Sequence, residues 1–242
     1  MGNALRVVLM SGLMILLVGS CCNSEVAEPG GERASETVTL VFEIELNQRV
    51  YEDSAWGDPP QLAIWLANET DGRVRTVAVT HRTGAGDWEG KVECAVALPY
   101  WVGFYGRETG REGPPTWDEP AADAVTCATP RAVLHATGQV RRGGRWAYYV
   151  EVNVSGDYSV HFPSLSDEGH SDRYGNGQPS LVYRGWIEAV EGVKSRPVLV
   201  GCTDQHEGVS ELKGGLGEIT TARELLKRIR VSCKRDSELT PP

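Results

Sequence analysis

The sequence has few histidines, no Cys-x-x-Cys pair and no excess of basic residues. No two of its five histidines have the spacing of a metal-binding pair. Without Cys-x-x-Cys, neither a zinc knuckle nor a thioredoxin-like redox pair is expected. A formal net charge of −9 leaves no basic stripe for nucleic acid and gives no surface-charge attraction to anionic lipid headgroups. These absences argue against metal, dithiol-redox and nucleic-acid functions.

Assembled catalytic motifs are also lacking. The stretch 169–173 (GHSDR) begins like a nucleophile elbow, but Arg173 replaces the second glycine that the strained elbow needs. Four oxygen-bearing residues fall in one loop, but their spacing does not fit an EF-hand calcium site. They are Asp167, Glu168, Asp172 and Asn176. The sequence therefore predicts neither an enzyme nor a metal site.

The N-terminal apolar run is too short to cross a membrane. Val7–Gly19 has 13 residues and follows Arg6, whereas a membrane-spanning helix needs about 20 apolar residues. The pattern is typical of a signal-peptide core. The run ends in Val18–Cys21 (VGSC), which resembles a bacterial lipobox, in which Cys21 would receive the lipid. The alternative is an ordinary cleaved secretory signal with Cys21 incidental.

These patterns predict the domain organisation. We expect a signal peptide over residues 1–20 and a flexible tether over residues 21–36, which are polar and acidic. A folded body then spans residues 37–235, and residues 236–242 form a disordered tail. The expected location is the bacterial cell envelope, outside the cytoplasm, with the membrane as a partner through the lipid anchor.

Period-two alternation indicates a mainly β body. In Thr37–Leu46 (TVTLVFEIEL) apolar and polar residues alternate, which predicts a strand with one buried face. Similar patterns predict strands at Gln61–Ala67, Arg73–His81, Ala132–Val140, Trp146–Val154, Tyr158–Phe162, Ser180–Val190 and Pro197–Thr203. Leu98–Tyr105 fits either a short helix or a strand. About eight short strands separated by turns favour a β-sandwich of immunoglobulin-like type.

Near the C-terminus the period changes. Ala222, Leu225, Leu226 and Ile229 follow helical spacing. Thr221 and Glu224 fit a capping box at the start of this segment. We therefore expect one amphipathic C-terminal helix packed on the sheets.

Cysteine spacing suggests disulfides. If Cys21 is lipidated and Cys22 is a spare thiol in the tether, four cysteines remain in the body, and they allow three pairings in an oxidising compartment. We expect Cys94–Cys127 and Cys202–Cys233, because neighbouring segments most often meet.

Exposed aromatic side chains are a further possibility for ligand contact, although most of the seven tryptophans are expected in the core. Trp65, Trp146 and Trp186 lie within predicted strands, which favours a place in the core. Three more lie in predicted loops, where aromatic rings can stack on sugars or peptide partners. They are Trp56, Trp88 and Trp117.

The segment 123–130 (DAVTCATP) resembles the acceptor motif of exported flavoproteins, which carry FMN on a threonine through a phosphoester. That motif has Asp, two or three variable residues, Ser or Thr, usually Gly, and then Ala-Thr. The matching residues are Asp123, Thr126, Ala128 and Thr129, whereas Cys127 stands where glycine is usual. The resemblance implies FMN on Thr129, delivered by a separate flavin transferase, with the flavin performing electron transfer. The alternative is a plain turn, with the threonines bonded to the local backbone and Cys127 in a disulfide.

Three stretches resemble a family of predicted periplasmic β-sandwich domains, domain of unknown function 2271. They are Arg73–Val79, the segment 123–129 and Tyr149–Asn153, within a region covering residues 37 to 163. Residues 178–183 and 218–222 fit the same family. The resemblance implies an immunoglobulin-like fold, and a flavin transferase or membrane redox protein as partner.

Taken together, the sequence predicts a non-catalytic binding or accessory module held outside the cytoplasm by a lipid anchor. The alternative is a flavinylated electron-transfer carrier with FMN at Thr129, where Asp123 and Thr126 complete the site. A hydrolase has no assembled motif behind it.

Overall fold

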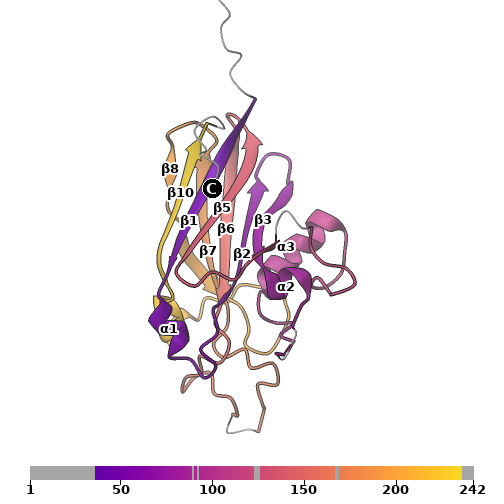
Figure 1. Ribbon diagram of the computed structural model, residues 1–242, viewed down its shortest axis with the longest axis vertical. Helices are drawn as coiled ribbons and strands as arrows, with labels where there is room; N and C mark the ends of the chain where they lie inside the picture. Colours follow the sequence, from indigo (N-terminus) through magenta and orange to yellow (C-terminus); the bar gives the residue numbers. More distant parts are fainter. Residues whose placement is uncertain (1–35, 89, 92, 123–125, 167–168, 236–242) are drawn as a thin grey trace, which may run out of the picture. The chain divides into compact units, whose positions relative to one another are not determined.

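Alternating apolar side chains bring two β-sheets face to face in the computed structural model (Figure 1). It describes residues 36–88, 90–91, 93–122, 126–166 and 169–235. The strands are β1 (Thr37–Leu46), β2 (Gln61–Asn68), β3 (Val74–Thr80), β4 (Thr126–Cys127), β5 (Val133–Arg141), β6 (Arg145–Asn153), β7 (Leu181–Glu188), β8 (Lys194–Ser195), β9 (Val198–Cys202) and β10 (Leu226–Lys234). The helices are α1 (Gln48–Glu52), α2 (His81–Ala85) and α3 (Pro99–Thr109), with 3-10 turns η1 (Leu216–Glu218) and η2 (Thr221–Glu224).

The predicted β-sandwich is confirmed. One sheet has the order β5-β1-β10-β8 and the other the order β4-β3-β2-β6-β7-β9; the only parallel pair among the described strands is β3 with β4. The first strand, β1, lies between β5 and β10 (Figure 1). This order differs from that of an immunoglobulin constant domain, in which the first strand lies at a sheet edge.

The main core lies between the two sheets. The apolar residues of β1 that the alternation marked are all at most 2 % exposed: Val38, Leu40, Phe42, Ile44 and Leu46. They face alternate residues of β2, β6 and β7 in the second sheet, and Phe42 meets Tyr148 edge to face with ring centroids 5.8 Å apart. Burial of these side chains, at roughly 1.5–3 kcal/mol each, stabilises the sandwich.

The six-stranded sheet is apolar on its outer face too. Trp65, on β2, is fully buried and stacks on Tyr149 of β6, with ring centroids 5.1 Å apart and planes 5° apart. Helix α3 covers these rings, and Phe104 lies 5.2 Å from each of them. Leu98–Tyr105, which the sequence left open between helix and strand, is therefore helical in its main part. None of the described helices is both long and apolar enough to cross a bilayer.

A buried carboxylate fastens α3 to the sheet. Glu151, on β6, is fully buried and accepts hydrogen bonds from the backbone N–H groups of Tyr100 (3.2 Å) and Trp101 (2.6 Å), in the first turn of α3. Ser180 Oγ donates a third bond at 2.5 Å. The carboxylate thus satisfies helix N–H groups that have no partner within the helix. Burial raises the pKa of Glu151 to about 7, against the opposing effect of these hydrogen bonds.

The predicted C-terminal helix is wrong. Residues 226–234 form β10, which pairs antiparallel with β1, and the preceding residues form the turn η2. Ile229, Val231 and Cys233 are buried in alternation, a period of two that overlaps the helical spacing beginning at Ala222. Pairing with β1 prevails because it gives hydrogen-bond partners to the backbone polar groups on one side of β1, which a helix at residues 226–234 would leave without partners. The predicted strand Tyr158–Phe162 is also wrong, since this segment forms turns and bends.

Neither predicted disulfide is present, because all four cysteines of the described body are free thiols. Cys202 lies opposite Leu181, at the start of β7. Cys233 exchanges backbone hydrogen bonds with Gly192 and Val193, beyond the other end of that strand. The eight residues of β7 span about 26 Å at a rise of roughly 3.3 Å each. A disulfide requires Cα atoms within about 7 Å, so this pair cannot form.

Cys94 and Cys127 are separated by the six-stranded sheet. Cys94 belongs to the apolar cluster on the outer face of that sheet, with Trp65. Cys127, on β4, packs against the main core on the other face. Proximity along the chain therefore does not become proximity in space.

The Glu151 carboxylate predicts a specific pH dependence of stability. Its pKa is about 7 in the folded chain and about 4.3 in an unfolded one, so between these values the folded chain binds more protons. The free energy of unfolding therefore falls as pH rises through this window. We expect Glu151→Gln to remove up to about 1.4 kcal/mol per pH unit of this slope, measured by urea unfolding at pH 5, 6 and 7. The surface variant Glu188→Gln is the control. Equal slopes for wild type and Glu151→Gln would contradict this role.

Candidate functional site

Three aromatic side chains from separate loops line one surface pocket. Trp56 follows α1, Trp88 follows α2, and Tyr174 lies in the long connection between β6 and β7. The pocket has a volume of about 280 Å³, and its other lining residues are Asp58, Arg82, Gly90, Lys91 and Ser155. An aromatic wall with a few polar groups is the usual composition of a small-molecule site.

Glycines hold the Trp56 ring in place. Gly175 has a φ of +64°, and a Cβ atom there would lie 1.6 Å from Cη2 of Trp56. A Cβ on Gly156 would lie 3.3 Å from the same indole. The indole therefore lies close against bare backbone, with the edge at Cη2 directed at Gly175, and 46 % of Trp56 stays exposed to solvent. Glycine is required at both positions because the Trp56 ring leaves little room for a side chain and because the backbone φ is positive.

Buried acids fix the loop that carries Tyr174. Asp172 is 7 % exposed and accepts hydrogen bonds from the N–H groups of Gly177 (2.8 Å) and Tyr174 (3.3 Å). Asp157 accepts from the N–H of Gln178 at 2.7 Å, and burial raises the pKa of Asp157 to about 8. The predicted polar loop is therefore held by internal hydrogen bonds on both sides of Tyr174.

The polar rim of the pocket carries two cations and one carboxylate. Asp58 lies 2.8 Å from Nζ of Lys91 and 3.6 Å from the Arg82 guanidinium. Its side chain is 19 % exposed, so these ion pairs are partly shielded from water. A further cation, Arg173, lies over the Tyr174 ring at 4.6 Å from the centroid and donates a hydrogen bond to its hydroxyl at 2.6 Å. The formal charge around the pocket is thus positive.

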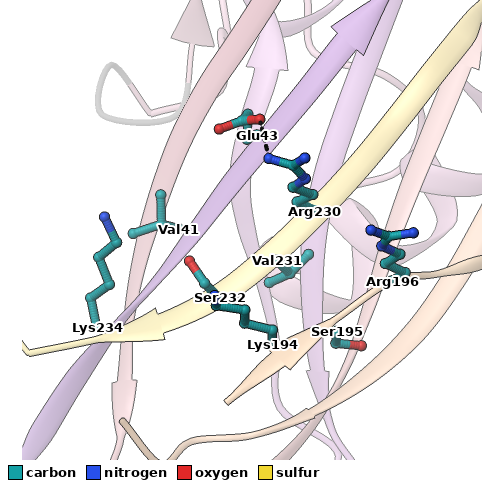
Figure 2. Close-up of a pocket in the computed structure, with 9 residues that line it drawn as sticks. All are labelled: Val41, Glu43, Lys194, Ser195, Arg196, Arg230, Val231, Ser232 and Lys234. Atoms are coloured by element: carbon teal, nitrogen blue, oxygen red, sulfur yellow. Dashed lines mark hydrogen bonds and ion pairs between the residues drawn. The ribbon is translucent and has the colours of Figure 1, made fainter. Parts of the chain in front are cut away.

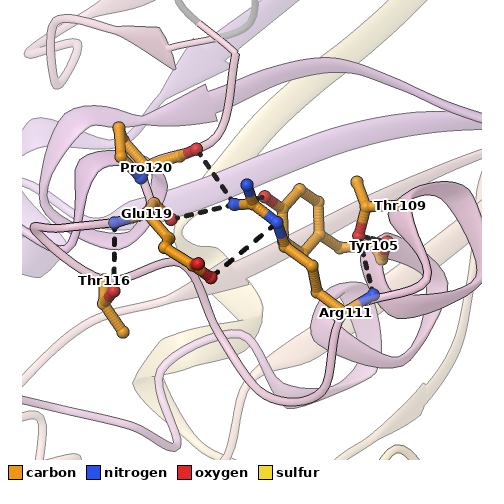
Figure 3. A network of polar contacts seen from close by, with 6 residues as sticks. All are labelled: Tyr105, Thr109, Arg111, Thr116, Glu119 and Pro120. Atoms are coloured by element: carbon orange, nitrogen blue, oxygen red, sulfur yellow. Dashed lines mark hydrogen bonds and ion pairs between the residues drawn. The ribbon is translucent and has the colours of Figure 1, made fainter.

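The loop after α3 lies close to Trp88. Trp88, Pro114 and Pro115 line the same narrow cavity. Arg111 ties this loop to α3 by donating to the Tyr105 hydroxyl (3.4 Å) and to the Glu119 carbonyl (3.2 Å), as Figure 3 shows. Trp88 also packs against the apolar cluster beneath α3. The side of the pocket formed by Trp88 therefore depends on the α3 layer.

The structure confirms part of the predicted division of the tryptophans into loop and core residues. Trp56 and Trp88 meet in the pocket, whereas Trp117 is 71 % exposed and does not line it. Trp65 and Trp146 are buried as predicted. Trp186 is 37 % exposed, because its side chain points away from the core and its indole donates to Glu69 at 2.5 Å. Its expected place in the core is wrong.

None of the described residues of the flavin motif lines this pocket, although β4 lies beside α2, which carries Arg82. Thr126 belongs to β4, which pairs with β3 through Val79. Thr129 is half-buried in the irregular segment between β4 and β5. Asp123 and the lipidation candidate Cys21 lie outside the described residues. Attachment of FMN stays a prediction.

The buried thiols are poorly suited to nucleophilic chemistry. Burial raises the pKa of Cys94 to about 12, and burial also raises the pKa values of Cys127 and Cys202. A thiol acts as a nucleophile only when ionised, so these groups are largely unreactive at neutral pH. Within the described ranges no cluster of three or more His, Cys, Asp or Glu is arranged to hold a metal ion. Of the oxygen-bearing loop residues, Asp167 and Glu168 lie outside those ranges.

Comparison with known proteins found no match to any family model, curated protein or solved structure. The resemblance to domain of unknown function 2271 therefore stays a prediction.

Sequence reasoning missed the residues that complete the pocket. Asp58 and Lys91 are ordinary loop charges in the sequence, and nothing in their spacing indicates that they meet. Tyr174 carried a weak signal, since it is followed by the glycine-rich stretch 175–177 (GNG) within a polar loop. Such a stretch suggests close backbone approach to another group, which here is the Trp56 ring.

A glycine substitution should displace Trp56 without dismantling the fold. Gly175→Ala and Gly72→Ala both place a side chain at positive φ, but a Cβ on Gly72 meets nothing within 4 Å. We expect each to cost about 1–2 kcal/mol of stability from the backbone conformation alone. Only Gly175→Ala should increase acrylamide quenching of tryptophan fluorescence, and this increase should vanish in a Trp56→Phe background. Unchanged quenching in Gly175→Ala would show that Trp56 does not lie against this glycine.

Proposed function

We propose that this protein is a non-catalytic binding module whose aromatic pocket takes a sugar residue of a glycan. The observation that carries the proposal is the meeting of Trp56, Trp88 and Tyr174 around a volume of about 280 Å³ with charged groups on its rim. This volume is near the lower end of the usual range for ligand pockets and suits one small ring rather than a large cofactor.

Sugar chemistry matches both parts of the pocket. The faces of aromatic rings carry partial negative charge, and the C–H groups on one face of a sugar ring pack well against them. The sugar hydroxyls would then lie near Asp58, Arg82 and Lys91, which offer both acceptors and donors. Each hydrogen bond to a charged group contributes more than one between neutral groups. Stacking would thus provide affinity, and the rim would select the arrangement of hydroxyls.

The charge of the rim disfavours a cationic ligand. Aromatic cages of three rings often bind quaternary ammonium groups through cation–π attraction. Here Lys91 and Arg82 outnumber the Asp58 carboxylate, and Arg173 already occupies one face of Tyr174. A bound cation would be repelled by these groups. The pocket therefore suits an uncharged sugar better than a cationic ligand.

The location of the module rests on the leader pattern. Residues 6–21 support a protein exported from the cytoplasm and anchored through Cys21 to a membrane of the bacterial envelope. A tethered β-sandwich with a sugar pocket would act as an accessory that holds glycan near the membrane.

The proposal predicts which aromatic residues matter for binding. Against soluble β-glucan, xylan and mannan in affinity gels, we expect retardation of wild type by at least one of these uncharged glycans. Trp56→Ala should weaken that interaction at least tenfold, because the ring supplies part of the stacking surface. Trp117→Ala is the matched control, since it removes an even more exposed indole outside the pocket. Equal loss in both variants, or no retardation by any of these glycans, would contradict the proposal.

A flavinylated carrier is the second candidate. It is supported by the position of Thr129, which is half-buried and lies outside the strands, where a transferase could reach its hydroxyl. Coexpression with a flavin transferase should then add the mass of FMN minus water, and Thr129→Ala should abolish the adduct. Thr137→Ala, which removes an exposed hydroxyl on β5, is the control. An unmodified intact mass after coexpression would contradict this candidate.

A further inference from the structure

A basic groove lies on the outer face of the four-stranded sheet, where β10 pairs with β8 (Figure 2). Its volume is about 680 Å³. Four cationic side chains line it, and Figure 2 shows them on two neighbouring strands and the residue that follows β8. They are Lys194, Arg196, Arg230 and Lys234. The groove shares no residue with the aromatic pocket.

The groove holds more positive charge than its own acid can neutralise. Its single carboxylate, Glu43, already lies 3.4 Å from Arg230 and 3.5 Å from Arg228. For Lys194, Arg196 and Lys234, no carboxylate of the described part of the chain lies within ion-pair distance. A concave surface lined by charge of one sign concentrates the field and attracts counter-ions. This concentration occurs in a chain whose net charge is −9.

The same sheet face provides an internal comparison. Further along β10, Arg228 lies 2.8 Å from Glu45, on β1, and the cross-strand charges there are matched. Toward the other end of β10, Lys234 lies opposite Thr39, and Ser232 lies between Val41 and Lys194. Hydroxyl groups and one aliphatic side chain thus replace the acids, so the unmatched charge is confined to the groove.

The cations form an extended pattern. Lys194 is opposite Ser232. Arg230 and Lys234 lie two residues before and two residues after Ser232 on β10, so their side chains are on the same face of the sheet. Two residues along a strand span about 6.7 Å, and adjacent strands are about 4.8 Å apart. The positive charges therefore follow a line of roughly 13 Å rather than converging on one point. A linear polymer with repeated negative charges matches this line better than a single phosphate does.

Two other polyanions fit less well. Proteins that bind single-stranded nucleic acid usually stack the bases on aromatic rings, and none of the residues lining the groove is aromatic. A bilayer presents a broad plane of headgroups, whereas these charges lie within a concavity. We propose that the basic groove binds a linear acidic polysaccharide through its carboxylate or sulfate groups.

The proposal is tested by measuring the binding of polygalacturonate and dextran sulfate, with uncharged dextran as reference. The triple variant Lys194→Gln, Arg196→Gln and Lys234→Gln should bind at least one of the acidic polymers at least tenfold more weakly. A control triple with the same change of charge, Arg49→Gln, Arg73→Gln and Lys227→Gln, should stay within about threefold of wild type. Because all six side chains are exposed, their loss should leave the circular dichroism spectrum unchanged.

A gain-of-function variant makes the test independent of any loss of folding. Glu43→Gln frees Arg230 from its ion pair and should raise affinity for the same polymer about two- to fivefold. Trp56→Ala should leave this affinity unchanged, which separates the groove from the sugar pocket.

Several results would overturn the proposal. They are equal losses in the two triple variants, no binding of either acidic polymer by wild type, and loss of acidic-polymer binding in Trp56→Ala alone. Tighter binding of oligothymidylate, or of vesicles containing phosphatidylglycerol, than of both acidic polysaccharides would also overturn it.

Discussion

The arrangement of this protein depends on one buried hydrogen-bonded contact, between the Glu151 carboxylate and the first turn of α3. The six-stranded sheet is apolar on both faces, so its outer face needs a covering layer. Glu151 stands on that sheet and fixes where the covering helix begins. The loops attached to that layer then place Trp88 at the surface, and the candidate site exists because the sheet is covered there.

The sequence predicted the parts of the fold that follow a simple period. Strands such as β1 and β6 were predictable from alternation or from a high density of β-branched and aromatic residues, and these strands indicate the sandwich. The last strand was mistaken for a helix because Ala222, Leu225 and Ile229 coincide with helical spacing, although Ala222 and Leu225 belong to a turn. Only pairing with β1, a long-range event, decides between the two. The disulfide prediction failed for a similar reason, since separation along the chain does not report which sheet face a thiol occupies.

The two candidate sites were visible in the sequence to different degrees. Two of the three loop tryptophans, Trp56 and Trp88, do meet in one pocket, because their loops lie close together in the folded chain. Their polar neighbours were not foreseeable, as Asp58, Arg82 and Lys91 come together only when α2 and its flanking loops are placed. The basic groove was hidden by the net charge of −9, which averages over the chain. Its cations come from β8, the residue after it and β10, and these strands are distant in sequence and adjacent in the sheet.

The central claim, that the aromatic pocket is a sugar site, is tested most directly by nuclear magnetic resonance of the tryptophan indole N–H groups during titration with oligosaccharides. The account predicts that the indole signals of Trp56 and Trp88 shift together and saturably, while that of Trp117 stays in place. Shifts confined to Trp117, or no shift of any indole with any oligosaccharide of the glycans tested, would contradict it.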